Sequence, residues 1–308
     1  KYLLADWMGQ GAPRFYEILR TIKEAGQNPR VKVLLVNLAG IQVTPEQAWE
    51  IREELVKAQA NGKKIVAYIE NGGMETYHLA SVADRLVMDP QGTLMLPGYV
   101  MGRTFFKGTL EKLGLKFDEW RYFEYKSAVE NLSREEFSDA DERQRQALVE
   151  DMYRLTTEEI AGSRDMDPQE IDDIIDKEVM VSADMALESG LADTLARWHN
   201  RDEMLKSLDY ENNQRLDHDR LHEMATASRQ WSEPNKIALI YGLGPTSMNT
   251  GIKARSLSKT IRNLTNDGDV KAIVFRVDSP GGDPMASDLV AEALAEASEK
   301  KPVIVSQG

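Results

Sequence analysis

The chain contains no cysteine, and this absence removes several kinds of chemistry. Without thiols there are no disulfides, no cysteine nucleophile and no thiolate ligands for a metal ion. The absence fits an oxidising or a reducing compartment equally well. The sequence also has no Walker loop and no GxGxxG turn, so neither common nucleotide-binding signature is present.

Positive charge and long apolar runs are also scarce. Lys and Arg number 38 against 51 Asp and Glu, which gives a net charge of −13. Nucleic-acid-binding proteins usually carry the opposite balance, so we expect no nucleic-acid partner. No stretch reaches 18 apolar residues, so the sequence predicts no membrane-spanning helix. The opening residues, KYLLADWMGQ, have too short an apolar run for a signal peptide.

The length of 308 residues predicts two folded units rather than one. Hydrophobic residues make up 42% and charged residues 29%, which is ordinary for a soluble globular protein. Both ends of the sequence fall at predicted strands, and we interpret them as cuts within a longer protein.

A β-α-β unit is predicted in the first quarter of the chain. Residues 31–38, VKVLLVNL, form a nearly continuous apolar run, which is typical of a strand buried on both faces of a parallel sheet. Thr44 is a good N-cap, Pro45 suits the first helical position, and Gln47 completes a capping box. Residues 63–70, KKIVAYIE, predict the next strand, which a right-handed crossover joins to the first.

The same order of elements returns near the end of the chain. Residues 270–277, VKAIVFRV, predict a buried strand, and residues 301–306, KPVIVS, predict the strand after it. Between them Asp283 is an N-cap and Pro284 opens a helix.

One sequence offset relates the two units. Val31 corresponds to Val270, and Ile22 in the preceding helix corresponds to Ile261, in each case 239 residues on. A constant offset over several elements favours an internal duplication. The alternative is two unrelated β-α-β units, which are common.

The residues between these units predict more helices and strands. We expect a strand, a turn and a second strand over 84–96, a helix over 103–114, a strand over 115–125, and helices over 139–161, 168–176 and 182–193. The predicted domains are residues 1–200, a polar and partly helical linker over 201–235, and a second repeat that starts at residue 236 and runs to 308.

Lys126 is a candidate general base within YFEYKSAVENL, between a predicted aromatic strand and a predicted helix. A lysine acts as a base only when neutral, and its ordinary pKa of about 10.4 leaves little neutral amine at pH 7. Burial among its apolar neighbours would lower that pKa; these are Phe123, Tyr125, Ala128 and Val129. Two other interpretations stay open: a solvated surface lysine, and a lysine kept charged by Glu124 on the same strand face.

Gly281 and Gly282 are candidates for binding a developing oxyanion. They lie in FRVDSPGGDP, where a predicted strand ends and a helix begins, and they have no side chains to screen their amides. The competing interpretation is a Pro-Gly turn that only starts a helix. The equivalent stretch of the first repeat, NLAGIQVTP over residues 37–45, lacks the double glycine, which favours the functional interpretation.

The histidines give little support for a metal site. His218 and His222 have the spacing of a helical metal pair, but they lie in the polar linker without the glutamate of an HExxH motif. We interpret them as solvated, and we predict neither a metal nor a cofactor.

The stretches YKSAVE and VDSPGG, in this order and inside a duplication, resemble the signal peptide peptidase A (protease IV) family in its long bacterial form. The resemblance runs from about Arg14 to Gly308 and includes HLASVADRLVMDPQGTL, FFKGTLEKLGLK and VKAIVFRVDSPGGDPMAS. It implies an α/β fold of tandem crotonase/Clp-like repeats with parallel sheets and β-α-β units, in which the second repeat is truncated here.

The resemblance also implies a serine endopeptidase with a Ser–Lys dyad that degrades cleaved signal peptides and other hydrophobic peptides. Lys126 matches the family's general base, and Gly281 and Gly282 match glycines of its oxyanion hole. No metal or cofactor is implied. The family forms homo-oligomeric rings or bowls on the periplasmic face of the bacterial inner membrane, and its anchor would lie before Lys1.

The sequence departs from the family at several places. Glu124 stands where the family has glycine, Asn131-Leu132 where it has proline and an aromatic residue, and Asp283-Pro284 where it often has serine and valine. The family's nucleophilic serine follows the last strand, and the repeat offset from Met74 places it near position 313.

None of the three serines in the relevant stretches matches the family's nucleophile; these are Ser127, Ser279 and Ser306. Two other functions therefore stay open. One is a non-catalytic scaffold or assembly subunit. The other is an acyl-CoA enzyme of the crotonase type, against which the Tyr-Lys-Ser stretch and the lack of an evident basic patch for CoA argue.

Overall fold

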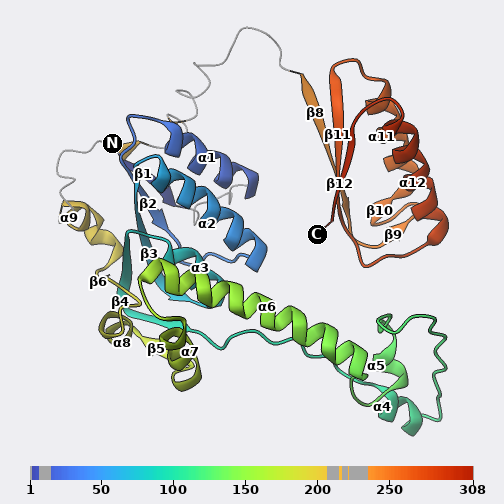
Figure 1. Ribbon diagram of the computed structural model, residues 1–308, viewed down its shortest axis with the longest axis horizontal. Helices are drawn as coiled ribbons and strands as arrows, with labels where there is room; N and C mark the ends of the chain where they lie inside the picture. The colour runs from blue at the N-terminus through green and yellow to red at the C-terminus, as the bar shows by residue number, and fades with distance from the viewer. Residues whose placement is uncertain (1, 7–14, 207–214, 217–220, 222–234, 308) are drawn as a thin grey trace. The chain divides into compact units, whose positions relative to one another are not determined.

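The structure is a computed structural model that describes residues 2–6, 15–206, 215–216, 221 and 235–307. The chain divides into two compact units, Lys1–Ser228 and Arg229–Gly308. Both are α/β units built on parallel strands, which confirms the predicted fold class (Figure 1).

The first unit is built around a seven-stranded sheet in the order β5-β4-β3-β2-β1-β7, with β6 paired to β4. All of its strand pairs are parallel except β4 with β5. The described elements are β1 Tyr2–Asp6, α1 Phe15–Gln27, β2 Val33–Asn37, α2 Pro45–Ala60, β3 Lys64–Gly72, α3 Met74–Ser81, β4 Arg85–Met95, α4 Lys107–Lys112, α5 Glu130–Ser133, α6 Asp139–Arg164, α7 Pro168–Lys177, β5 Met180–Ser182, α8 Ala183–Glu188, β6 Thr194–Leu195, the 3-10 helix η1 Trp198–Asn200, α9 Arg201–Lys206 and β7 Arg215–Leu216.

The predicted crossover helix forms as α2. The Thr44 hydroxyl accepts a hydrogen bond from the Gln47 amide at 3.3 Å, and the Gln47 side chain accepts one from the Thr44 amide at 3.1 Å. Both halves of the capping box are therefore present, and Pro45 lies in the first turn as predicted.

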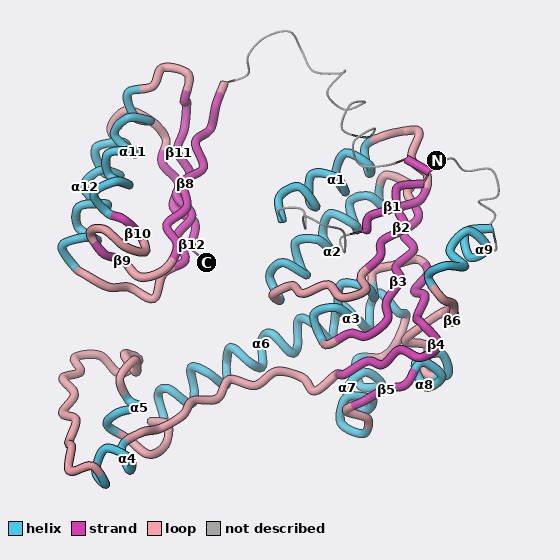
Figure 2. The backbone as a smooth tube through the Cα atoms, turned by 180° about the vertical axis from the view of Figure 1, so that it is seen from behind, coloured by secondary structure: helices cyan, strands magenta, loops and turns pink. Residues whose placement is uncertain are grey.

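Both faces of the β2–β3 region are covered, which explains the unbroken apolar runs of these strands. Leu34 and Val36 belong to the core that includes residues of α1 and α2. Val33 and Leu35 point to the opposite face, where they cluster with Leu205 of α9. Figure 2 shows α1 and α2 side by side along the sheet.

A long helix extends from this sheet and holds a small lobe at its far end (Figures 1 and 2). Helix α6 has 26 residues, and its buried residues include Thr156, Ile160 and Ala161 near the sheet. Its opposite end lies beside α4 and α5. We call residues 103–145 the arm; it contains Lys126.

The second unit is a three-stranded parallel sheet in the order β12-β11-β8 with two helices on one face (Figures 1 and 2). Its elements are β8 Lys236–Leu243, β9 Thr246–Ser247, β10 Ile252–Lys253, α11 Ala254–Asn266, β11 Val270–Asp278, α12 Pro284–Ser298 and β12 Val303–Gln307. Ile273 and Phe275 of β11 pack in one cluster with residues of α11 and α12.

The two units repeat the same order of helices and strands, as the duplication predicts. The order α1-β2-α2-β3 corresponds to α11-β11-α12-β12, and β1 flanks β2 as β8 flanks β11. The spacing before the central strand differs, because Leu3 pairs with Leu34, which is 34 − 3 = 31 residues on, whereas Ala238 pairs with Ile273, which is 273 − 238 = 35 residues on. Asp283 caps α12 through its side chain, as predicted.

Two predictions between the repeats are wrong. Residues 84–96 form no turn between two strands: β4 is one strand, and both of its halves pair in parallel with β3 on either side of a register shift. A Cβ at Gly92 would lie 2.0 Å from the Glu70 carbonyl oxygen, so Asp-Pro-Gln-Gly forms a bulge pressed against its neighbour.

Residues 115–125 form no strand, and the helix predicted over 103–114 is confined to Lys107–Lys112. Many side chains of the former stretch are exposed, including Trp120, Tyr122, Phe123 and Tyr125. Apolar alternation produces a strand only where a neighbouring strand pairs with it, and no strand pairs with this described stretch.

Candidate active site

Lys126 lies on an irregular loop of the arm and is exposed. Its amide donates a hydrogen bond to the Phe123 carbonyl at 3.2 Å, which closes a local turn. Phe123, Tyr125 and Val129 are exposed as well, so they do not enclose the lysine within the first unit. Glu124 shares no strand face with Lys126, because this stretch forms no strand, and it pairs with Arg143 of α6 at 2.5 Å.

The residue after the lysine is anchored in a buried polar network. The Ser127 hydroxyl donates to Asp141 Oδ1 at 2.8 Å, and Arg103 Nη1 donates to the Ser127 carbonyl at 2.7 Å. Arg145 Nε donates to Asp141 Oδ2 at 3.0 Å. Burial favours a raised pKa for the Asp141 carboxyl, but the bonds from Ser127 and Arg145 outweigh it, so its pKa lies below its ordinary value.

A second buried carboxylate lies four residues beyond the lysine. Glu130 Oε1 forms an ion pair with Arg121 Nη2 at 2.5 Å and accepts a hydrogen bond from the Ser138 hydroxyl at 2.5 Å. Burial again acts to raise the pKa of Glu130, while the bonds from Ser138 and Arg121 lower it below its usual range. Because Arg121 precedes Lys126 and Glu130 follows it, this ion pair closes the lysine loop.

The sequence did not single out Asp141, Glu130 or their arginine partners. Charged residues on an acidic helix usually face solvent, yet Asp141 and Glu130 are both completely buried. Their spacing along the chain gives no sign of this, since the partners come from separate segments that only the folded arm brings together.

In the second unit, the glycine loop has a backbone that requires glycine. Gly281 has a φ of +99° and Gly282 a φ of +153°. The loop is fixed against Thr246, whose amide donates to the Gly281 carbonyl at 2.8 Å and whose carbonyl accepts from the Asp283 amide at 2.8 Å.

The two candidate amides differ in their bonding. The Gly281 amide donates to the Ser279 hydroxyl at 3.2 Å. The Gly282 amide makes no hydrogen bond to any described residue, and Gly282 is exposed beside the start of α12. Gly282 is therefore the amide that is free to bind an incoming oxygen in this structure.

The three serines considered in the sequence are all bonded within the structure. Ser127 is buried against Asp141, Ser279 bonds the Gly281 amide, and Ser306 accepts a hydrogen bond from Arg276 at 2.9 Å. Met74, from which the repeat offset placed the expected nucleophile, begins α3 directly after β3 and is buried.

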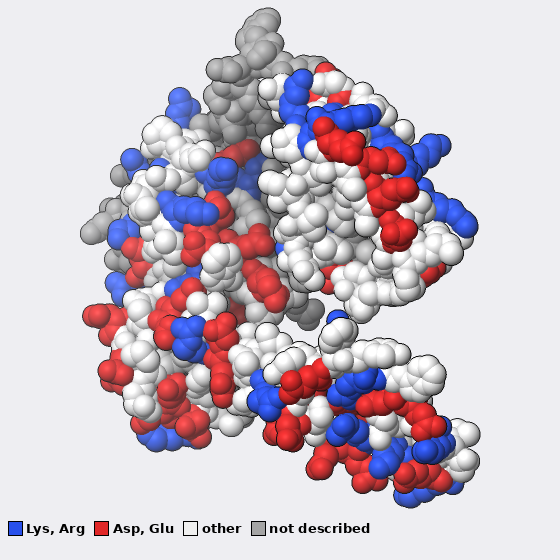
Figure 3. Space-filling model, turned by 45° about the vertical axis from the view of Figure 1, so that its right-hand side comes forward, with Lys and Arg blue, Asp and Glu red and all other residues white. Residues whose placement is uncertain are grey.

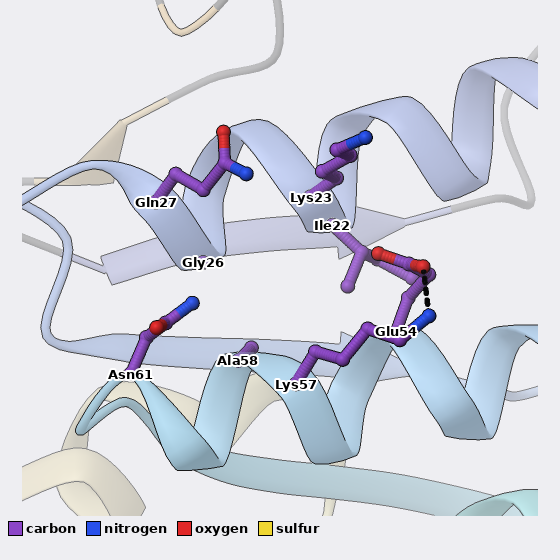
Figure 4. Close-up of a pocket in the computed structure, with 8 residues that line it drawn as sticks. All are labelled: Ile22, Lys23, Gly26, Gln27, Glu54, Lys57, Ala58 and Asn61. Atoms are coloured by element: carbon purple, nitrogen blue, oxygen red, sulfur yellow. Dashed lines mark hydrogen bonds and ion pairs between the residues drawn. The ribbon is translucent and has the colours of Figure 1, made fainter.

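Other features of the described residues hold no alternative site. A pocket between α1 and α2 contains the Lys57–Glu54 ion pair of 2.7 Å, and its eight lining residues do not include Lys126, Gly281 or Gly282 (Figure 4). No group of His, Cys, Asp and Glu among the described residues has a metal-binding arrangement. His218 and His222 lie outside the described residues.

Charged side chains of both signs lie on the described surface. On the face shown in Figure 3, Lys and Arg side chains are interspersed with Asp and Glu and form no continuous basic area. Among the described helices none has the length and apolar content to cross a membrane.

The chain is similar to known proteases over nearly its whole length. It is 28% identical over 312 residues to Protease 4 of Salmonella typhi, covering 95% of this chain and 50% of that protein. It is 26% identical over 303 residues to the chloroplastic serine protease SPPA of Arabidopsis thaliana, covering 92% of this chain and 44% of that protein. The chain thus spans about half the length of these relatives.

A solved structure and a protein family also match. The N165D mutant of ClpP1 from Listeria monocytogenes aligns with a TM-score of 0.40 and 8% identity, over 64% of this chain and 88% of that chain. The pattern of Peptidase family S49 matches residues 57–215, which is just over half of the chain and includes Lys126. The chain therefore belongs to peptidase family S49.

Proposed function

We propose that this chain is part of a serine endopeptidase with a Ser–Lys dyad, in which Lys126 is the general base. The observation that carries the proposal is the peptidase family match over the segment that contains Lys126. The anchored loop supports it, because a base must be held where it can reach the proton that it removes.

In this mechanism the neutral Lys126 amine takes the proton of a serine hydroxyl while the serine oxygen attacks the peptide carbonyl carbon. The carbonyl oxygen becomes an oxyanion, and the amide of Gly282 donates to it; the Gly281 amide joins if its bond to Ser279 opens. The Lys126 ammonium then protonates the leaving amine. Water hydrolyses the resulting acyl-enzyme with Lys126 again as the base.

The nucleophile is expected a few residues beyond position 308. Leu34 pairs with Ile65 in the first unit, and Ile273 pairs with Val303 in the second, so the paired strands are 65 − 34 = 31 and 303 − 273 = 30 residues apart. The repeat offset therefore falls from 239 to 238 at β12, and the position equivalent to Met74 becomes 312 rather than 313. Like Met74, it would lie in the first turn of a helix.

The family resemblance supports a proposal for the substrates, assembly and location of the whole protein. We propose that it cleaves hydrophobic peptides, among them spent signal peptides, as a homo-oligomer at the periplasmic face of a bacterial inner membrane. The names of its relatives, Protease 4 and serine protease SPPA, support peptide cleavage.

The test is peptide cleavage by the intact protein, by Lys126→Ala and by Lys126→Arg, together with labelling by a fluorophosphonate. Loss of cleavage in both variants and a label mapped to a serine near position 312 are expected. Because Lys126 is exposed, both variants should keep the wild-type unfolding midpoint. Unchanged cleavage by Lys126→Ala would exclude the dyad, and an unlabelled protein without peptidase activity would favour the scaffold function.

A further inference from the structure

Two buried residues, Ser127 and Glu130, lie among exposed residues of the loop that carries Lys126. Residues 122–126 are all exposed, Ser127 is buried, Ala128 and Val129 are exposed, and Glu130 is buried again. The backbone of this loop has turn hydrogen bonds, from Lys126 to Phe123 and from Glu130 to Ser127, but it is part of no strand or long helix. The buried side chains of Ser127 and Glu130 therefore supply much of its restraint. Ser127 is the nearer anchor, directly adjacent to the lysine.

The network behind Ser127 is completely satisfied. Asp141 uses Oδ1 for the Ser127 hydroxyl and Oδ2 for Arg145, and Arg103 Nη1 lies 3.4 Å from Oδ2 while it also binds the Ser127 carbonyl. Asp141 therefore fixes Ser127 directly through its hydroxyl and indirectly through its carbonyl. Two contacts to one residue restrict its backbone more than either contact does alone.

The network connects the lysine loop to the rigid part of the first unit. Asp141 and Arg145 both lie in the first two turns of α6, and Arg145 also lies over the Phe137 ring at 5.2 Å. At its other end α6 is joined to the sheet region by a hydrogen bond between the Tyr99 and Thr156 hydroxyls at 3.0 Å and by the Arg164–Asp193 ion pair at 2.8 Å.

We propose that Asp141 is a positioning residue for Lys126: through Ser127 it sets the direction in which the lysine side chain leaves the loop. This rests on the proposed function, in which Lys126 is the base. A carboxylate is suited to the task because it accepts hydrogen bonds from Ser127 and Arg145 and pairs with the charge of Arg103 at the same time. Asp141 itself is too enclosed to touch a substrate.

The test measures kcat and KM of peptide cleavage for the intact protein and four variants. Asp141→Asn takes away the charge and one acceptor oxygen of the anchor, and Ser127→Ala removes its hydroxyl. Ser127→Thr keeps the hydroxyl, and Asp139→Asn changes an exposed acid on the same helix turn. We expect kcat to fall about 10- to 100-fold in the first two, because a displacement near 1 Å has such an effect. KM should stay within about threefold, since substrate binding does not use the anchor.

Ser127→Thr should recover most of the wild-type kcat, and Asp139→Asn should match the wild type. The alanine variant leaves Asp141 and both arginines in place and lacks only the hydroxyl. If threonine restores kcat, the loss in the alanine variant is therefore due to the missing hydroxyl and not to a general loss of folding. If Ser127→Ala and Asp141→Asn keep the wild-type kcat while Lys126→Ala is inactive, the positioning role is wrong and the dyad stands. If Lys126→Ala is fully active, the proposed function itself fails.

Discussion

Thr246 and Gly282 approach so closely that the glycine has no room for a side chain. A Cβ at Gly282 would lie 2.2 Å from the Thr246 carbonyl oxygen and 2.9 Å from its nitrogen. The two residues form an isolated parallel bridge beyond the ends of β8 and β11. The double glycine thus has a structural cause as well as the proposed catalytic one. Both glycines have a positive φ, but the close approach of Thr246 excludes a side chain only at Gly282.

This relationship predicts different costs for two neighbouring substitutions. Gly281→Ala meets no atom within 4 Å, so only its positive φ is strained, at about 1–2 kcal/mol of unfolding free energy. Gly282→Ala adds overlap with backbone atoms and should cost about 3 kcal/mol or more. Urea unfolding of the second unit measures both. A Gly282→Ala variant as stable as Gly281→Ala would contradict the close approach.

A second prediction concerns Arg52, which is buried beneath α6. Its guanidinium lies 2.9 Å from Glu159 Oε2 and donates to the His78 carbonyl at 3.0 Å and to the Ser163 hydroxyl. Burial lowers the pKa of Arg52, and the Glu159 charge opposes that effect. Arg52→Met takes the guanidinium away from all of these acceptors, although the His78 carbonyl keeps the Ser81 hydroxyl and Glu159 Oε2 keeps His78 Nε2. The loss of the buried ion pair should destabilise the protein by about 3 kcal/mol.

The matched control is Arg154→Met on the exposed side of α6. Arg154 pairs with Asp151 at 2.7 Å and Glu158 at 3.0 Å, but all three side chains are more than half exposed. Such pairs contribute about 0.5 kcal/mol. Thermal or urea unfolding should therefore show a much larger loss of unfolding free energy for Arg52→Met than for Arg154→Met. A loss in Arg52→Met as small as that in Arg154→Met would show that the buried network stabilises little.

A third prediction is that acid loosens the arm. The pKa values of Asp141 and Glu130 are lower in the folded protein than in the unfolded chain. The unfolded chain then binds more protons, so the stabilisation is complete above the ordinary carboxyl pKa of about 4. It is lost as the pH falls from there through the lower folded values.

Hydrogen exchange corrected for the intrinsic effect of pH can measure this loosening. Peptides over residues 119–131 should lose protection at a higher pH than peptides over β2, whose five residues are all buried and include no carboxyl group. Glu130→Gln should shift the loss of protection in the arm and leave β2 unchanged. Simultaneous loss in both regions at every pH would mean that the arm does not open separately.

Local patterns predicted much of the fold because the relevant interactions lie close together in the sequence. The Thr44–Gln47 capping box and the Asp283 cap involve residues at most three apart, and both form as expected. The wrong predictions depended on partners far away. Residues 115–125 find no strand to pair with, while the turn residues of 84–96 are drawn into one strand by β3.

The sequence by itself determined the α/β class, the repeated order of elements and the candidates Lys126, Gly281 and Gly282, since apolar periodicity, caps and glycine pairs are local properties. Only the tertiary structure decided that Asp141 and Glu130 are buried beside the lysine loop. It also decided that the Gly281 amide, but not the Gly282 amide, is bonded to another described residue. Burial and hydrogen-bond partners arise from segments distant along the chain, and no local pattern specifies which of them meet.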